Sequence, residues 1–265
     1  MRLCSIASGS SGNCIYVGDE RTHLLVDTGI SKKRIDEGLH TLGVKADELS
    51  GILITHEHSD HIQGLGVFSR KYEIPIYATK GTIDGIKEYK ALGKMPEGLL
   101  HPVDIDHKFQ LGDMEIQPFA TSHDSRESLG FRITLPGGRR VAVATDTGVM
   151  TDTVRAALSG CDLVHIESNH DVRMLENGPY PYYLKRRILA DTGHLSNDAC
   201  AAELTALAQN GTTRFVLAHL SRENNLPEIA YMTAQAALCG AGMQENIDFL
   251  LQVAPRGAEA PVTLF

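Results

Sequence analysis

The stretch ILITHEHSDHIQG, residues 52–64, joins an apolar run to a dense group of polar side chains. Residues 52–55 have the short, partly β-branched composition of a buried strand. Four groups that are costly to bury without partners follow directly: His56, His58, Asp60 and His61. A lone histidine after a strand is usually an ordinary surface or core residue, but so dense a group needs a common partner, and a divalent metal ion satisfies every member. The stretch therefore predicts a metal-binding loop at the carboxyl end of a strand.

Three later strand-like runs end in the same kind of residue. FATSHD reaches His123, VAVATDTG reaches Asp146 and FVLAHLS reaches His219. Because ligand sites in layered α/β proteins gather at the carboxyl ends of strands, we expect these side chains to converge on the same site. Nitrogen and oxygen ligands without a thiolate suit zinc, manganese or iron, so the residues leave the identity of the metal open.

Composition places the chain among ordinary globular proteins. It has 265 residues, 42% hydrophobic and 22% charged, without a repeat or a linker, which favours one domain of mixed strands and helices. No run approaches the roughly 20 apolar residues of a membrane-spanning helix and no secretory signal is visible, so we expect a cytoplasmic protein. Five scattered cysteines without a CxxC pair are expected to be reduced. The formal charge of −8 argues against a protein that coats nucleic acid through a general basic field.

Hydrophobic periodicity and turn residues predict strands in both halves of the chain, with helices between them. The expected strands are residues 2–7, 14–18, 22–29, 51–55, 74–79, 108–121, 161–168 and 214–221, with a hairpin over 129–148. The expected helices are residues 31–42, 62–73, 82–92, 198–210 and 227–238, the fourth capped by Ser196 or Asn197. The apolar end APVTLF, residues 260–265, is expected to dock on the fold.

The motifs together resemble those of the metallo-β-lactamase superfamily, whose HxHxDH signature stands here unaltered as HEHSDH. The combination of SGSSGN, THEHSDH, ESNHD, GHLSND and HLSRENN is similar to the YycJ/WalJ group of exonucleases with this fold. The resemblance covers nearly the whole chain and implies a four-layer αββα sandwich formed by a single domain over residues 1–265. The segment between Asp146 and His219 is too short for the β-CASP insertion of related nucleases.

The resemblance also implies a ligand set for two divalent ions, Zn²⁺ or Mn²⁺, with Fe²⁺ as a further option. The ligands it implies are His56, His58 and His123 for the first ion, Asp60, His61 and His219 for the second, and Asp146 as the bridge; Asp60 is also counted as catalytic. Asp27 in LLVDTG matches an earlier family motif and would orient the ligand loop. Asp-Thr-Gly equally suits a plain tight turn.

Two further residues distinguish between the substrates that a dinuclear hydrolase can use. Phosphodiesterases of this superfamily pair a glutamate after a strand with a histidine at a helix start, and that histidine protonates the leaving oxygen. Glu167 in VHIESNHD and His194 in GHLSND resemble this catalytic pair. The alternative is that His194 caps the following helix and Glu167 is a surface charge.

Polar loops near these motifs offer candidates for substrate contact. The candidates are Ser10, Asn13, Lys185, Arg186, Ser221 and Asn224. YPYYLKRR, residues 180–187, mixes tyrosines with basic side chains, which suits base stacking and phosphate binding. It equally suits a solvated helix face with tyrosines turned to the core, and SGSSGN, which contains Ser10 and Asn13, equally suits a simple turn between strands.

The leading interpretation is a dinuclear metal-dependent phosphodiesterase that acts on nucleic acid as a 5′-to-3′ DNA exonuclease. RNA is a second candidate substrate, and no membrane association or obligate protein partner is expected. A small-molecule cyclic phosphodiesterase or another hydrolase of this fold is the alternative enzyme. A metal-stabilised binding module without catalysis is the alternative outside enzymes.

Overall fold

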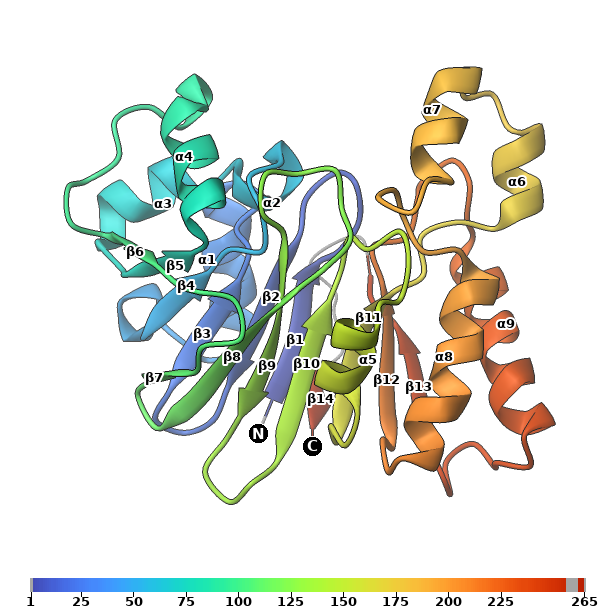
Figure 1. The fold of residues 1–265 in the computed structure, drawn as a ribbon. Helices are drawn as coiled ribbons and strands as arrows, with labels where there is room; N and C mark the ends of the chain where they lie inside the picture. The colour runs from blue at the N-terminus through green and yellow to red at the C-terminus, as the bar shows by residue number, and fades with distance from the viewer. Residues whose placement is uncertain (1, 256–261, 265) are drawn as a thin grey trace. The chain divides into compact units, whose positions relative to one another are not determined.

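A computed structural model describes residues 2–255 and 262–264 (Figure 1). The described residues divide into two compact units. The first contains residues 2–118, 125–129, 255 and 262–264, and the second contains residues 119–124 and 130–254. The expectation of a single domain over the whole chain stays a prediction.

The first unit contains a seven-stranded sheet in the order β14-β1-β2-β3-β4-β5-β6. Its strands are β1 (Arg2–Ala7), β2 (Cys14–Gly18), β3 (His23–Val26), β4 (Gly51–Leu53), β5 (Ile76–Ala78), β6 (Leu100–Pro102) and β14 (Thr263–Leu264). The strands from β3 to β6 run parallel, whereas β14, β1, β2 and β3 pair antiparallel. The carboxyl ends of β3 and β4 therefore lie side by side, and these are the ends that lead into Asp27 and His56.

Helices of the first unit pack their apolar sides on this sheet. They are α1 (Lys32–Thr41), α2 (Ser59–Ile62), α3 (Leu65–Tyr72), α4 (Lys80–Glu88) and the 3₁₀ turns η1 (Ala46–Glu48) and η2 (Lys90–Leu92). Ser31 caps α1 by accepting a hydrogen bond from the amide of Arg34, as the sequence predicts. Ile35, Phe68 and Ile86 are buried in one cluster with strand residues. A hairpin of β7 (Phe109–Leu111) and β8 (Met114–Ala120) completes the unit, and the unit boundary falls inside β8.

The helix predicted over residues 62–73 is α3, which begins only at Leu65; Ile62 is the last residue of the separate helix α2, and Gly64 lies at the break between them. Its amide donates to the carbonyl of Thr28 at 2.8 Å. A Cβ at Gly64 would meet the carbonyl oxygen of Ile30 at 2.0 Å. Gln63 and Gly64 keep right-handed helical dihedral angles, but the amide of Gly64 bonds to the segment after β3 instead of to the preceding turn, so the helical hydrogen-bond pattern is interrupted here.

The second unit is built around strands β9 (Leu129–Thr134), β10 (Arg140–Ala144), β11 (Leu163–Glu167), β12 (Arg214–Ala218) and β13 (Leu250–Val253). They pair in the order β13-β12-β11-β10-β9, and all but the predicted hairpin β9–β10 are parallel. The helices are α5 (Asp152–Leu158), α6 (Val172–Asn177), α7 (Tyr182–Ile188), α8 (Asn197–Gln209) and α9 (Pro227–Gly240). Figure 1 shows α8 and α9 packed beside β12 and β13, while α6 and α7 stand apart from that pair.

Several predicted details agree with the structure. Ser196 caps α8 by accepting from the amide of Ala199, so of the two predicted caps Ser196 is the right one. β14 pairs with β1, which confirms docking of the C-terminal end at residues 263–264; residues 260, 261 and 265 lie outside the described part. All five cysteines are free thiols, and only Cys239 is exposed. Within residues 2–255 and 262–264, no helix combines the length and the apolar character needed to traverse a bilayer.

Candidate metal centre

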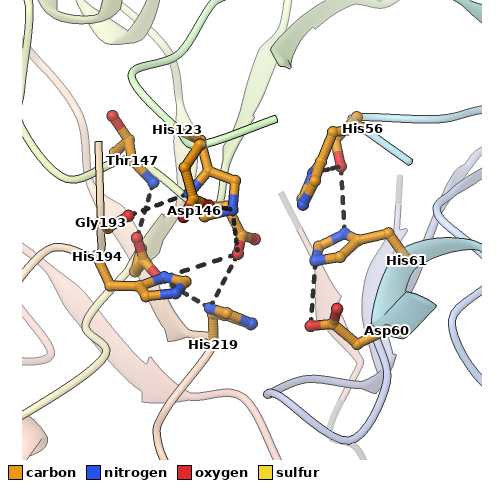
Figure 2. A network of polar contacts seen from close by, with 12 residues as sticks. His56, Asp60, His61, His123, Asp146, Thr147, Gly193, His194 and His219 are labelled. Carbon is orange, nitrogen blue, oxygen red and sulfur yellow. Dashed lines mark hydrogen bonds and ion pairs between the residues drawn. The ribbon is translucent and has the colours of Figure 1, made fainter. Parts of the chain in front are cut away.

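The ligand loop of the first unit, residues 56–61, is separated from β4 by two residues and runs into α2. His56 and His61 are 1% and 0% exposed, and His58, the N-cap of α2, is partly buried. The ring centroids of His56 lie 4.6 Å from those of His58 and 4.1 Å from those of His61. Asp60 Oδ2 is 3.5 Å from His61 Nε2 (Figure 2). In the first unit His56 therefore lies beside both His58 and His61, and His61 lies beside Asp60.

Asp27 fixes the ligand loop through hydrogen bonds. It is fully buried, and its backbone is left-handed with φ 62°. Oδ2 lies 2.8 Å from His61 Nδ1, and Oδ1 accepts from the backbone amide of Thr55 at 2.9 Å. Because the carboxylate accepts the hydrogen on Nδ1, the imidazole of His61 presents Nε2 as its ligand atom. This arrangement favours the orienting role predicted for Asp27 over a plain turn.

Asn13 also binds the ligand loop. It is 1% exposed, and its amide Nδ2 lies 3.1 Å from His61 Nε2. Its backbone amide donates to the carbonyl of Asp60 at 2.8 Å, while its own carbonyl accepts from Gly29 at 2.7 Å. Asn13 thereby connects the SGSSGN turn, the DTG turn and α2. Its predicted substrate contact stays a prediction, because what the structure shows is a side chain that fixes the loop.

In the second unit the carboxyl ends of three parallel strands supply the candidate residues. Asp146 follows β10, Glu167 ends β11 and His219 follows β12 directly. Asp146 and His219 have left-handed backbone conformations, with φ 53° and 54°. Such conformations are rare outside glycine and concentrate at functional sites. They turn each side chain away from the path that the strand would give it.

Glu167 is the centre of the polar network in this unit. Its Oε1 lies 2.8 Å from His194 Nδ1 and 2.7 Å from His219 Nδ1. Its Oε2 accepts from the backbone amides of Thr147 and Leu195, and the side chain is fully buried. Figure 2 shows His194 and His219 side by side beneath Asp146. The structure therefore brings the predicted pair Glu167 and His194 together, and adds His219 to it.

The alternative reading of this pair is wrong. Ser196, not His194, caps α8, and Glu167 is a buried group rather than a surface charge. Burial by itself would lower the pKa of His194, but the neighbouring Glu167 carboxylate outweighs burial, so the pKa is raised above its ordinary value. Burial conversely works to raise the pKa of Glu167, and the histidines that bind it lower that pKa. His194 is thus equipped to hold a proton near neutral pH.

His123 is oriented by the loop that carries His194. Its Nδ1 lies 3.1 Å from the carbonyl oxygen of Gly193, which accepts the hydrogen, and its Nε2 lies 3.8 Å from Asp146 Oδ1. The same loop is fixed by Ser122, whose hydroxyl donates to the carbonyl of Asp191. His123 therefore presents Nε2 toward Asp146 (Figure 2).

A buried amide network behind these residues escaped the sequence reasoning. Asn225 Nδ2 donates to the carbonyls of Ser168 and Asn169, and Asn197 Nδ2 donates to Asn225 Oδ1. Asn169 Nδ2 in turn donates to the carbonyl of His219 at 2.8 Å. The network ties the ends of β11 and β12 to the start of α8. Asn225 belongs to the motif HLSRENN, but the spacing of that motif does not distinguish Asn225 from Asn224.

The other predicted substrate contacts lie in different surroundings. Ser10 and Arg186 are exposed and Lys185 is partly buried, whereas Ser221 and Asn224 are 5% and 0% exposed. The amide of Asn224 donates to Ser221 Oγ, so this pair closes the turn after β12. Their contact with substrate stays a prediction.

The donor chemistry of both groups fits divalent metal. In the second unit, ligand atoms of Asp146, Glu167, His194 and His219 lie within 4.8 Å of one another. In the first unit, the loop residues His56, His58, Asp60 and His61 supply imidazole nitrogens and a carboxylate. No thiolate belongs to either group, as is usual for zinc and manganese sites of hydrolases.

Comparisons with known proteins agree with this chemistry. A family model described as "Beta-lactamase superfamily domain" matches residues 22–220. The chain is 38% identical to "Exodeoxyribonuclease WalJ" of Streptococcus pneumoniae over 97% of this chain and 96% of that protein. It is 39% identical to "Exodeoxyribonuclease YycJ" of Bacillus anthracis over 88% and 87%. The metallo-β-lactamase fold protein YhfI from Bacillus subtilis has the same fold, with a TM-score of 0.73 and 16% identity over 99% of both chains, which confirms the predicted αββα fold class.

Proposed function

We infer that this protein hydrolyses the phosphodiester bonds of DNA with bound divalent metal. The chain belongs to the β-lactamase superfamily and, within it, to the group of the WalJ and YycJ exodeoxyribonucleases. The observation that carries this inference is the pairing of the buried Glu167 with the partly buried His194, beside Asp146 and His219. Bond cleavage in DNA expels an alkoxide, which needs a proton at neutral pH. A thiolate, by contrast, can leave without first being protonated, so thioester hydrolysis would give this pair no role.

The ligand assignment is part of the proposal. As the superfamily motifs imply, His56, His58 and His123 would hold one ion, Asp60, His61 and His219 a second, and Asp146 both. Bound divalent ions would supply an activated nucleophile and neutralise the charge that builds on the phosphoryl group. Zn²⁺ and Mn²⁺ are the ions that we propose, with Fe²⁺ next, because the donors are imidazoles and carboxylates.

His194 is the proposed general acid. Nδ1 is engaged by Glu167, so the opposite ring nitrogen, Nε2, is the atom that can deliver a proton to the leaving oxygen. Glu167 keeps the ring oriented and stabilises its protonated form. His194 remains 15% exposed at its side chain, which leaves it open to a substrate, whereas Glu167 is sealed.

The substrate and the polarity can be tested directly. A duplex labelled at the 5′ end should release labelled mononucleotide early, and the same duplex labelled at the 3′ end should release its label late. Activity should vanish on chelation and return with Mn²⁺ or Zn²⁺. Turnover of bis(p-nitrophenyl) phosphate without any degradation of DNA would instead indicate a small-molecule phosphodiesterase. Metal binding without hydrolysis of either substrate would indicate a binding module.

A further inference from the structure

Helix α7 of the second unit exposes two neighbouring aromatic rings. Tyr182 and Tyr183 are 75% and 74% exposed, and their adjacency in the chain gives the helix a contiguous aromatic surface. The alternative in which these tyrosines turn to the core is therefore wrong. Figure 1 shows α6 and α7 projecting beyond the ends of β11 and β12, the strand ends that carry Glu167 and His219.

The three basic residues of α7 have different surroundings. Lys185 Nζ donates to the carbonyl of Glu176, and Arg187 donates to both carboxylate oxygens of Asp124. Arg186 is exposed, and its guanidinium carbon lies 6.0 Å from the ring centroid of Tyr182. Arg186 is thus the basic side chain of the helix that is best placed to reach a phosphate, with a ring at its side.

Two contacts join α7 to the proposed catalytic residues of its own unit. The amide of His194 donates to the carbonyl of Ile188, the last residue of α7, at 2.9 Å. Arg187, which shares a helix face with Tyr183, is anchored to Asp124, the residue after His123. The exposed rings therefore stand on an element that is fixed to the loops of both His194 and His123.

We propose that Tyr182, Tyr183 and Arg186 form a binding platform for an unpaired segment of the DNA substrate. This proposal rests on the proposed function and specifies the form of its substrate. Exposed aromatic rings stack on bases only where the faces of those bases are open, as in a single strand, and an adjacent guanidinium binds the phosphate between them. A duplex hides those faces inside its own stack.

The local charge also favours a nucleic acid strand as the occupant. Residues 172–188 contain four basic side chains and one acidic side chain, in a chain whose formal net charge is −8. A basic, aromatic segment in an acidic protein attracts a polyanion locally without coating DNA in general.

The test compares the variant Tyr182→Ala/Tyr183→Ala with Met232→Ala as the matched control. Met232 is a helical residue of the same unit and is 65% exposed. Each protein is assayed on a single-stranded oligonucleotide, on a blunt duplex of the same sequence and on bis(p-nitrophenyl) phosphate, which has no bases to stack. The measured quantity is kcat/KM on the single strand divided by the turnover of the small diester. We expect this ratio to fall about tenfold or more in the double variant, because KM for the single strand rises. The control should keep the wild-type ratio, and in Arg186→Ala the ratio should fall less than in the double variant.

Each outcome decides the proposal. An unchanged ratio, or an equal loss on all three substrates, overturns the platform, because the rings would then be idle or merely support His194. An oligomeric wild type that dissociates to monomers in the double variant also overturns it, because the face would then be a contact between copies. If the wild type hydrolyses no substrate, the proposed function fails separately. Fluorescence anisotropy with the labelled single strand then tests the platform, and equal affinity of wild type and double variant sinks it.

Discussion

At the scale of single residues, Glu167 binds two histidines for which we propose different roles. One carboxylate oxygen orients both His194 and His219, and the other is held by two backbone amides. A carboxylate fixed on four sides cannot follow either ring, so both imidazoles keep their direction. The proposed acid and a proposed metal ligand are therefore positioned by the same buried group.

Replacing His194 with alanine should separate chemistry from metal binding. We expect His194→Ala to retain its metal content, measured by elemental analysis, and to lose about 10²- to 10⁴-fold in DNA hydrolysis, because a positioned general acid typically contributes that much. His107→Ala is the control, since the His107 side chain is 82% exposed. Full activity in His194→Ala would remove the acid role, and loss of metal would make His194 a ligand.

His170 makes stability depend on pH in the acid range. It is 1% exposed, and neither ring nitrogen has a hydrogen-bond partner among the residues that the structure describes. Burial lowers its pKa to about 4. The unfolded chain, with an ordinary histidine pKa, binds a proton more readily than the folded chain, so the stability from this group is complete above about pH 6.5 and falls as the pH drops toward 4.

The corresponding variant is His170→Asn, which cannot titrate in this range. Urea unfolding of the wild type should lose about 1 kcal/mol more than His170→Asn between pH 7.5 and 5.5. His107→Asn should behave as the wild type. Part of the slope should survive in His170→Asn, because burial also lowers the pKa of His165, to about 3. Parallel pH profiles for the wild type and His170→Asn would show that His170 does not contribute.

At the scale of elements, glycines of the turns after strands set the position of the ligand loop. Gly29 lies against the loop so closely that a Cβ there would meet the carbonyl oxygen of Asp60 at 1.6 Å. Gly29 also donates its amide to Asn13. The DTG motif thus contributes a carboxylate for His61 and the space that α2 needs.

Gly29→Ala should displace α2 and with it the donors of the first unit. We expect a loss of about 1–3 kcal/mol in unfolding free energy, as for overpacked sites, together with lower metal content. Gly240→Ala is the control, because a Cβ there meets nothing within 4 Å. A Gly29→Ala protein with wild-type stability and metal content would contradict this account of the turn.

The sequence predicted those elements whose signal is local. Alternating or apolar runs with turn residues at their ends gave β1, β2, β11 and β12, and a serine cap gave α1 and α8. The short helices α5 and α6 and the strands β6 and β13 were not predicted, because pieces of three to seven residues owe their form to tertiary packing more than to propensity. The break at Gly64 depends on a backbone contact with Thr28, which no periodicity reports.

The same division holds for the candidate site. His56, Asp60, Glu167 and His194 stand in recognisable motifs, so their types and order could be predicted. The shared use of Glu167 by His219, 52 positions away, could not, because it depends on the parallel register of β11 and β12. The amide network of Asn225 escaped for the same reason: its partners are 28 to 57 residues distant.

At the scale of the whole molecule, bound metal should stabilise the fold. Buried imidazole nitrogens and carboxylate oxygens are costly unless their lone pairs have a partner, which a cation supplies. A ligand that binds only the folded state also raises its stability by mass action. We expect the chelated protein to gain several degrees in Tm when Mn²⁺ or Zn²⁺ is restored, measured by scanning calorimetry.

His58→Ala should show a much smaller gain under the same conditions, because one proposed ligand is missing. His107→Ala should gain as much as the wild type. If metal left the Tm of the wild type unchanged, the proposed ligand set would be wrong.

The left-handed backbone at Asp27, Asp146 and His219 limits how such a protein could be redesigned. Aspartate, asparagine and histidine tolerate that conformation far better than β-branched or bulky side chains do. In a library that saturates these three codons to shift metal preference, most variants would therefore fold poorly. Randomising His56 or His58, neither of which has a left-handed backbone, would leave more of the library folded and open to selection.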